Sequence, residues 1–230
     1  MFLDPMYFVF AGPAVLLALY AQFKVRRTYA RYARVPSAAG LTGAEVARHL
    51  LSIAGLHNVH VERVPGDLTD HYDPGARVVR LSDSNYASHS IAALGVTAHE
   101  VGHAIQHATA YRFMNLRSAL VPVAGIGSNL GYILFLVGFF IASFQLATFG
   151  LILFSGAALF AAVTLPVEFN ASNRAMALLT EHGMVSNEDA GMAKKVLNAA
   201  ALTYVAGLAQ ALSQVLYFAF MLSGMRRSDD

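Results

Sequence analysis

The sequence predicts a mainly α-helical integral membrane protein with about four transmembrane helices and a compact cytoplasmic α+β unit that contains a short hairpin. Composition is the first observation behind this prediction. Of the 230 residues, 56% are hydrophobic and only 13% are charged, whereas soluble domains have about 25% charged residues. The second observation is that four apolar runs each approach the ~20 residues needed to cross a bilayer. The alternative is a soluble protein in which all four runs are buried helices.

The four runs cover about residues 6–23, 120–144, 146–167 and 203–222. The first resembles a secretory signal peptide. However, no basic residue precedes it and five follow it, so we expect a retained signal anchor. The second and third runs almost adjoin, so only a tight turn at about 143–148 can connect them.

Basic residues predict the orientation of these runs. Five follow the first run and three lie between the third and the fourth: Lys24, Arg26, Arg27, Arg31 and Arg34, then Arg174, Lys194 and Lys195. Because basic residues accumulate on the cytoplasmic side, we expect segments 24–118 and 168–202 in the cytoplasm and both termini outside. The chain is then a single domain, residues 1–230, that crosses the plasma membrane several times.

The first polar segment carries signals for one helix and two strands. Thr42-Gly43-Ala44-Glu45 has the capping-box pattern, so a helix is predicted over 44–54. Residues 59–64 alternate in strand fashion, and 77–81 form a second β-rich run after the turn signal Asp73-Pro74-Gly75. These runs predict the short hairpin. The run 77–81 is alternatively an edge strand that pairs with an extended peptide.

A long helix is predicted over about 86–111, with N-caps supplied by 82–85. It carries an HExxH pattern, His99-Glu100-Val101-Gly102-His103. Two histidines four residues apart face the same side of a helix, so both imidazoles can hold one metal ion. Zinc accepts such ligands, and the glutamate between them can act as a base toward a metal-activated water. The alternative is two histidines that are hydrogen-bonded in a core.

Two glycines, Gly95 and Gly102, lie on the histidine face of this helix. Each costs about 1 kcal/mol relative to alanine in a helix interior. We therefore expect another backbone or a substrate to approach this face closely.

Glu168 is the predicted third ligand. A catalytic zinc takes three protein ligands and keeps one position for water. The chain has no cysteine, so the third ligand must be His, Glu or Asp. Glu168 follows the third apolar run on the predicted cytoplasmic side, where Pro166 can begin a helix. The alternative is an interfacial carboxylate that pairs with Arg174.

Small residues surround Glu168 on the same predicted helix face: Ala171, Ser172 and Ala175. The two alanines allow tight packing against the glycine-bearing helix, and Ser172 can orient a ligating histidine. His107 continues the series from His103, but a fourth ligand would close the water position. We therefore predict a hydrogen-bonding role for His107.

Three stretches resemble known families: Asp70-His71-Tyr72-Asp73-Pro74, residues 98–106 and residues 165–175. HExxH followed after a hydrophobic hairpin by E-x-x-A-x-x-x-A is similar to the HtpX and CAAX-prenyl-protease membrane metallopeptidases, which are gluzincins. The chain more closely resembles the YugP-type membrane zinc metallopeptidases, and the order of apolar runs extends this resemblance over nearly the whole chain. One difference is Ser172, where HtpX-like enzymes carry aspartate.

The resemblance implies a zincin-like catalytic unit in a bacterial membrane zinc metallopeptidase whose active site faces the cytoplasm. His99, His103 and Glu168 would bind one Zn²⁺ per chain, and Glu100 would be the catalytic base. Peptide hydrolysis also needs a donor to the developing oxyanion. The candidates for this role, or for orienting a ligand, are Ser172, His71, Tyr72, Asn173 and Arg174.

The expected partners are a protein or peptide substrate, membrane-associated substrates included, and the lipid bilayer. A net charge of +2 does not indicate a nucleic-acid partner. One competing function is a non-proteolytic zinc-binding membrane scaffold or chaperone-like factor, but a purely structural site does not require Glu100. A second is an intramembrane protease, but the helix over 86–111 is too polar for a lipid-exposed span. A di-iron oxygenase would need several histidine boxes, and the sequence has one.

Overall fold

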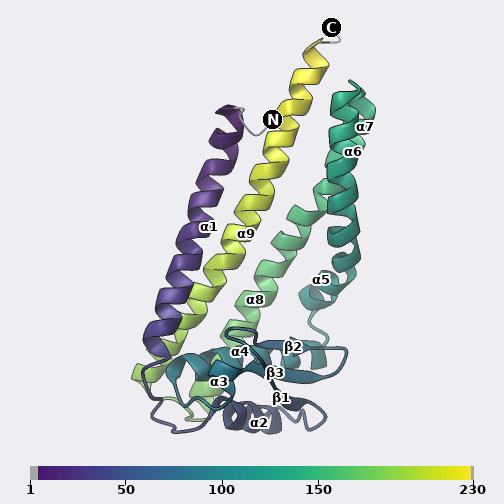
Figure 1. Cartoon of the computed structure of the whole chain (residues 1–230). Helices are drawn as coiled ribbons and strands as arrows, with labels where there is room; N and C mark the ends of the chain where they lie inside the picture. The colour runs from purple at the N-terminus through teal and green to yellow at the C-terminus, as the bar shows by residue number, and fades with distance from the viewer. Residues whose placement is uncertain (1–4, 229–230) are drawn as a thin grey trace. The chain divides into compact units, whose positions relative to one another are not determined.

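The computed structural model describes residues 5–228 and is mainly helical, with one small sheet (Figure 1). The chain divides into two compact units. The apolar unit comprises 1–21, 115–166 and 203–230, and the polar unit comprises 22–114 and 167–202. The extreme ends of the predicted domain, 1–4 and 229–230, lie outside the described residues.

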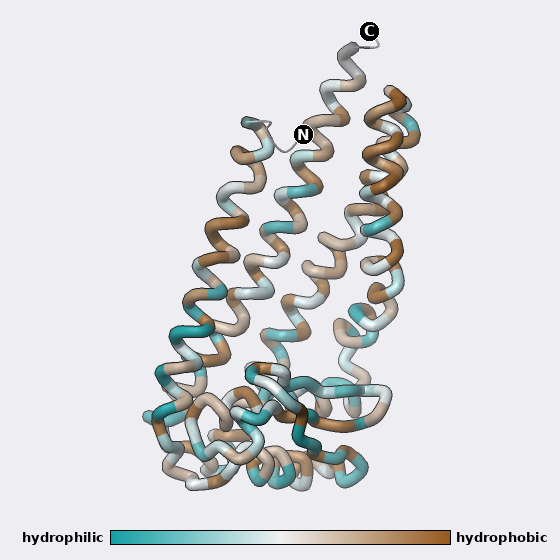
Figure 2. Tube along the Cα trace, viewed as in Figure 1, coloured by the Kyte–Doolittle hydropathy of each residue, from teal (hydrophilic) through white to brown (hydrophobic). Residues whose placement is uncertain are grey.

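The helices, in chain order, are α1 (Pro5–Tyr32), α2 (Gly43–Ile53), α3 (Asp83–Tyr86), α4 (Ile91–Ala108), α5 (Arg112–Pro122), the π-helical turn η1 (Val123–Gly127), α6 (Ser128–Phe140), α7 (Phe144–Phe154), α8 (Gly156–Glu181) and α9 (Asn187–Ser228). Within residues 5–228, four helical stretches are long and apolar enough to cross a membrane: Pro5–Tyr32, Arg112–Phe140, Phe144–Glu181 and Asn187–Met225. Figure 2 shows the hydrophobic residues concentrated along α6 and α7 and hydrophilic residues frequent around the sheet. The four predicted apolar helices are therefore confirmed as membrane-length segments.

The turn between α6 and α7 is shorter and earlier than predicted. It comprises residues 141–143, because the Ser143 hydroxyl accepts a hydrogen bond from the Leu146 amide and so begins α7. Ala142 has a positive φ of 56°, which reverses the chain within so few residues. The predicted turn at 143–148 is wrong for most of its length.

Glycines let the backbones of α6 and α7 approach each other closely. A Cβ atom placed on Gly131 would lie 2.7 Å from the carbonyl oxygen of Gly150, and one on Gly138 would meet the backbone of Ala147. Aromatic rings complete the core of this unit, where Phe135 and Phe218 stack with centroids 4.2 Å apart. Close packing at small residues is typical of helices in apolar surroundings.

The polar unit contains a three-stranded sheet of order β1-β3-β2, from β1 (His60–Val64), β2 (His71–Asp73) and β3 (Val78–Ser82). β3 is the central strand, parallel to β1 and antiparallel to β2. The hairpin therefore joins β2 to β3, with the Asp73 carboxylate accepting hydrogen bonds from the Gly75 and Ala76 amides in its turn. The alternative assignment of 77–81 as an edge strand is wrong, because both sides of β3 are already paired.

The long helix predicted over 86–111 is shorter in the structure: it is α4, Ile91–Ala108, and the short α3, Asp83–Tyr86, precedes it as a separate helix. Ser90 begins α4, since its hydroxyl accepts from the Ala93 amide. An isolated antiparallel bridge joins Ser90 to Pro36. The short segment between α3 and α4 is not helical. The predicted capping by Ser82 is not made; its hydroxyl instead donates a hydrogen bond to Asp70. The capping box predicted at Thr42 and Glu45 is confirmed.

At Gly102, the backbone of α4 closely approaches that of α8 within the polar unit. A Cβ atom on Gly102 would lie 2.6 Å from the carbonyl oxygen of Ala171, whereas one on Gly95 would lie 3.6 Å from the Cβ of Ala193 in α9. The expected close backbone approach is thus confirmed at Gly102. Gly95 makes only ordinary van der Waals contact, and its partner is a different helix.

We expect Gly102→Ala to lower the stability of the protein by about 1–3 kcal/mol, because the new methyl group must displace the α8 backbone. Gly95→Ala is the matched control and should be neutral or stabilising by up to about 1 kcal/mol, because it gains helix propensity without a clash. Thermal unfolding of both variants in detergent measures the difference. Equal midpoints for the two variants would contradict this account of Gly102.

Candidate metal centre

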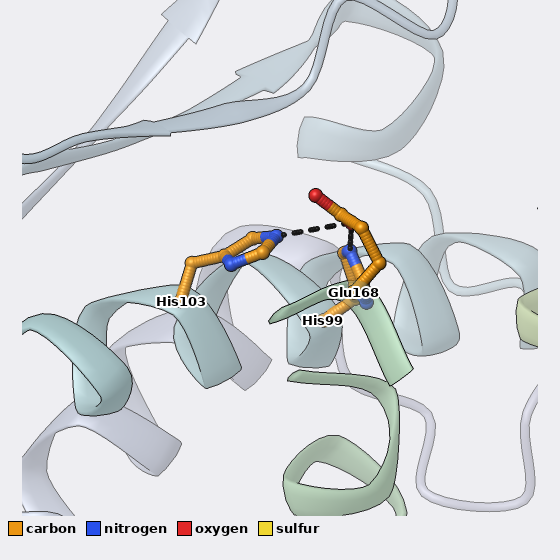
Figure 3. A group of neighbouring side chains, drawn as sticks. All are labelled: His99, His103 and Glu168. Atoms are coloured by element: carbon orange, nitrogen blue, oxygen red, sulfur yellow. Dashed lines mark hydrogen bonds and ion pairs between the residues drawn. The ribbon is translucent and has the colours of Figure 1, made fainter. Parts of the chain in front are cut away.

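Three side chains from two helices converge in the polar unit. His99 and His103 come from α4 and Glu168 comes from α8, and Figure 3 shows both imidazoles directed at the carboxylate. Glu168 Oε2 lies 3.2 Å from His99 Nε2 and 3.4 Å from His103 Nε2. One potential ligand atom from each residue lies within 4.8 Å of the others. The structure therefore brings together the three residues predicted as metal ligands.

The spacing and chemistry of these atoms suit zinc. Donors about 2.0–2.1 Å from a tetrahedral ion lie roughly 3.3–3.4 Å from one another, which is close to the two observed nitrogen–oxygen separations. Two imidazole nitrogens and one carboxylate oxygen are also the donor set of catalytic zinc sites, which leave a fourth position open. Glu168 is only 2% exposed, and a buried carboxylate requires a positive partner. The residues present fit the ion.

Gln106 fixes the orientation of the His103 ring. Its amide nitrogen donates to the carbonyl of Val167 at 2.7 Å and to Asn170 Oδ1 at 3.0 Å. The amide oxygen of Gln106 therefore faces His103 and accepts from Nδ1–H at 2.9 Å. With Nδ1 protonated, the lone pair of a neutral imidazole lies on Nε2, toward Glu168.

Ser172 lies beside the other histidine, as predicted. Its hydroxyl lies 3.1 Å from His99 Nδ1, which leaves Nε2 directed at Glu168. Ala171 and Ala175 on the same face of α8 are fully buried, and the contact at Gly102 brings this face against α4. The sequence pattern E-x-x-A-S-x-x-A thus places a ligand, a small packing residue and a hydrogen-bonding partner along one helix face.

The electrostatics couple His103 to two carboxylates. Burial would lower the pKa of His103, but the hydrogen bond to Glu168 and the nearby negative charge of Glu100 outweigh it, so the pKa is raised above 6.5. Protons therefore compete with a metal ion for Nε2 of His103.

Zinc affinity is expected to decline with falling pH, beginning above pH 6.5. A proton on His103 must leave before a metal can bind Nε2, and the raised pKa holds that proton at higher pH than in a free imidazole. Each displaced proton changes the affinity about tenfold per pH unit below the pKa. Competition with a chromophoric chelator across pH 5.5–8.5, a range set about the ~6.5 pKa of free imidazole, measures this dependence.

Glu100→Gln serves as the control for this titration, because it removes a charge that raises the pKa of His103 while leaving all three predicted ligands in place. The decline should then begin at lower pH than in the unmodified protein. A decline that begins at the same pH in both proteins would contradict the assigned coupling.

Two further predicted site residues, His71 and Tyr72, are neighbours on β2 but have different surroundings. Tyr72 is half-buried, and its hydroxyl lies 2.8 Å from His107 Nδ1, so the hydrogen-bonding role predicted for His107 is confirmed. Burial raises the pKa of Tyr72, which keeps its phenol protonated at neutral pH. His71 is exposed beside Thr69 and Arg80. Successive strand residues point to opposite faces, so His71 lies on the other side of the sheet.

Asn173 and Arg174 on α8 complete the set of predicted site residues. Asn173 is exposed on α8. Arg174 Nε donates to Asn170 Oδ1 at 2.8 Å, and its guanidinium lies 5.9 Å from the Tyr111 ring centroid. The alternative in which Glu168 pairs with Arg174 is not the arrangement observed, because Glu168 faces the two histidines.

Gln106 and Asn170 are the residues whose roles the sequence reasoning missed. Gln106 has a signal that could have been used, because it lies three residues after His103 and therefore shares its helix face. Asn170 lies two residues after Glu168 and has no such signal. Its position becomes apparent only when α4 and α8 are packed together.

The fold and site define a mainly helical protein with membrane-length apolar helices and a histidine–histidine–glutamate site suited to zinc. Residues 7–223 match the family model described as "putative neutral zinc metallopeptidase", and the chain belongs to this family. It is 47% identical over 214 residues to "putative membrane protease YugP" of Bacillus subtilis (strain 168), covering 93% of this chain and 95% of that protein. No solved structure matches the chain. The family resemblance predicted from the sequence is confirmed.

Proposed function

We propose that this protein is a zinc-dependent endopeptidase that hydrolyses peptide bonds at the cytoplasmic surface of the membrane, with Glu100 as the general base. The observation that carries this proposal is the convergence of His99, His103 and Glu168, with each Nδ1 engaged by a separate polar partner. Family membership and the relative described as a membrane protease support the same reaction class.

Bound zinc would supply a Lewis acid that polarises a water molecule and the scissile carbonyl. Glu100 is only 8% exposed and lies next to His99 in the sequence, near enough to His103 to influence its pKa. In this position its carboxylate takes the proton of the attacking water and later delivers it to the leaving amine. Gln106 and Ser172 hold the two imidazoles so that neither rotates away.

Tyr72 is our choice among the candidates for oxyanion stabilisation. It comes from β2, its ring packs against the hydrophobic core to which α4 contributes, and its hydroxyl reaches His107, one turn beyond His103. A phenol with a raised pKa remains a donor at neutral pH. His71 and Arg174 are less suitable because they contact other residues, and Asn173 is exposed on α8.

Metal removal and restoration test the proposed function. We expect the purified protein to contain one zinc per chain and to cleave members of an unbiased peptide library. A chelator should abolish cleavage, and zinc should restore it, whereas magnesium should not, because magnesium prefers an all-oxygen octahedral site. Zinc content by atomic absorption and cleavage by mass spectrometry are measured on the same sample. One bound zinc without cleavage of any soluble or membrane-derived peptide would favour the scaffold function instead.

A further inference from the structure

A basic cleft of about 360 Å³ lies in the polar unit, between the C-terminal part of α1 and the N-terminal part of α9. Among the described residues that line it, four are basic and none is acidic. The basic residues are Lys24, Arg27, Arg31 and Lys195, and Thr28 and Asn198 add polar groups. The cleft is separate from the residues of the candidate metal centre.

Three of the basic residues share one face of α1. Lys24, Arg27 and Arg31 are spaced three and four residues apart, so their side chains are neighbours along the helix. Like charges at this spacing repel one another and destabilise a helix. Lys195 adds a further positive charge from α9. An anion in the cleft would attract each of these basic side chains and so offset their mutual repulsion.

The lining suits a phosphate group in particular. Arginine presents a planar fork of donors that matches phosphate oxygens, and lysine adds a mobile point charge. The Thr28 hydroxyl and the Asn198 amide are neutral donors at the same cleft. Its volume falls within the ~300–1,000 Å³ of typical small-molecule sites, so a phosphodiester with a small headgroup fits.

The sequence around the cleft favours a lipid as the source of that phosphate. In α1 the basic face begins at Lys24, directly after the apolar run 6–23, and in α9 the lining residues precede the apolar run 203–222. Basic pockets beside membrane-length helices bind anionic headgroups. We propose that this cleft binds the phosphate group of an anionic phospholipid.

The test uses the full-length protein in a neutral detergent. Dioctanoyl phosphatidylglycerol, dioctanoyl phosphatidylcholine and inorganic phosphate are titrated separately, and bound ligand is counted by native mass spectrometry. Arg27→Gln/Arg31→Gln removes two charges from the cleft. Arg26→Gln/Arg34→Gln is the matched control, since it removes two exposed charges from the same segment outside the lining. Zinc content and circular dichroism confirm that each variant is folded.

We expect saturable binding of phosphatidylglycerol and at least about tenfold weaker binding of phosphatidylcholine. The cleft variant should bind phosphatidylglycerol roughly 20-fold more weakly, and the control variant should change by less than about threefold. Equal losses in the two variants, or no saturable binding, would overturn the site. Binding of inorganic phosphate with the same dependence on Arg27 and Arg31, but none of phosphatidylglycerol, would overturn the lipid assignment.

Discussion

Glu100→Gln is expected to reduce peptide hydrolysis by about 10²–10⁴-fold while the protein retains one zinc per chain. The glutamine has the same shape but cannot take a proton from water, so only the general-base contribution is lost. Its two neighbours at the site, His99 and His103, keep their approach to Glu168. Initial cleavage rates at saturating zinc, together with zinc content, provide the measurement.

A matched substitution separates loss of the base from loss of charge in general. Glu181→Gln changes an exposed glutamate at the C-terminal end of α8, and it should leave both rate and zinc content unchanged. Full activity in Glu100→Gln would eliminate the proposed mechanism. Parallel loss of zinc and activity in that variant would instead show that Glu100 acts on the metal site itself.

Glu168→Ala is expected to weaken zinc binding by more than about 100-fold. The substitution removes the oxygen that lies within 3.4 Å of both histidines and leaves two imidazoles to hold the ion. The expected loss exceeds the roughly 10–100-fold that follows removal of a residue that only orients a ligand. Competition with a chelator of known affinity measures it, and circular dichroism monitors the helices.

Ser172→Ala provides the comparison for that measurement. It removes the hydroxyl beside His99 Nδ1 and keeps all three predicted ligands, so its zinc affinity should fall by only about 10–100-fold. Zinc affinity should therefore be highest in the unmodified protein, lower in Ser172→Ala and lowest in Glu168→Ala. An unchanged zinc affinity in Glu168→Ala would remove this residue from the ligand set.

Local signals in the sequence predicted much of the candidate site. His99 and His103 follow from helix periodicity, and Ser172 follows from its spacing after Glu168. The choice of Glu168 depended on a longer argument, in which the absence of cysteine and the order of apolar runs brought a distant segment to the histidines. The structure places Glu168 beside both histidines, as this argument requires, and its role as a ligand stays a prediction.

The sheet and the break before α4 could not be predicted in the same way. β1 and β3 pair in parallel, and parallel strands need a crossover connection, which here contains β2. No local sequence pattern specifies such non-local pairing. The helix break depends on the bridge between Pro36 and Ser90, which joins segments more than fifty residues apart. Both features come from tertiary contacts, which helix and strand propensities do not describe.

The division of the predicted ligands between α4 and α8 has a consequence for biosynthesis. The chain emerges from its N-terminus, so both histidines are made before Glu168, and the apolar stretches in α6 and α7 are made in between. A nascent chain therefore holds an incomplete donor set until α8 has been synthesised and Ala171 has settled against Gly102. Under the proposed function, zinc would load only after this assembly, and an unfinished chain would not yet hydrolyse its neighbours.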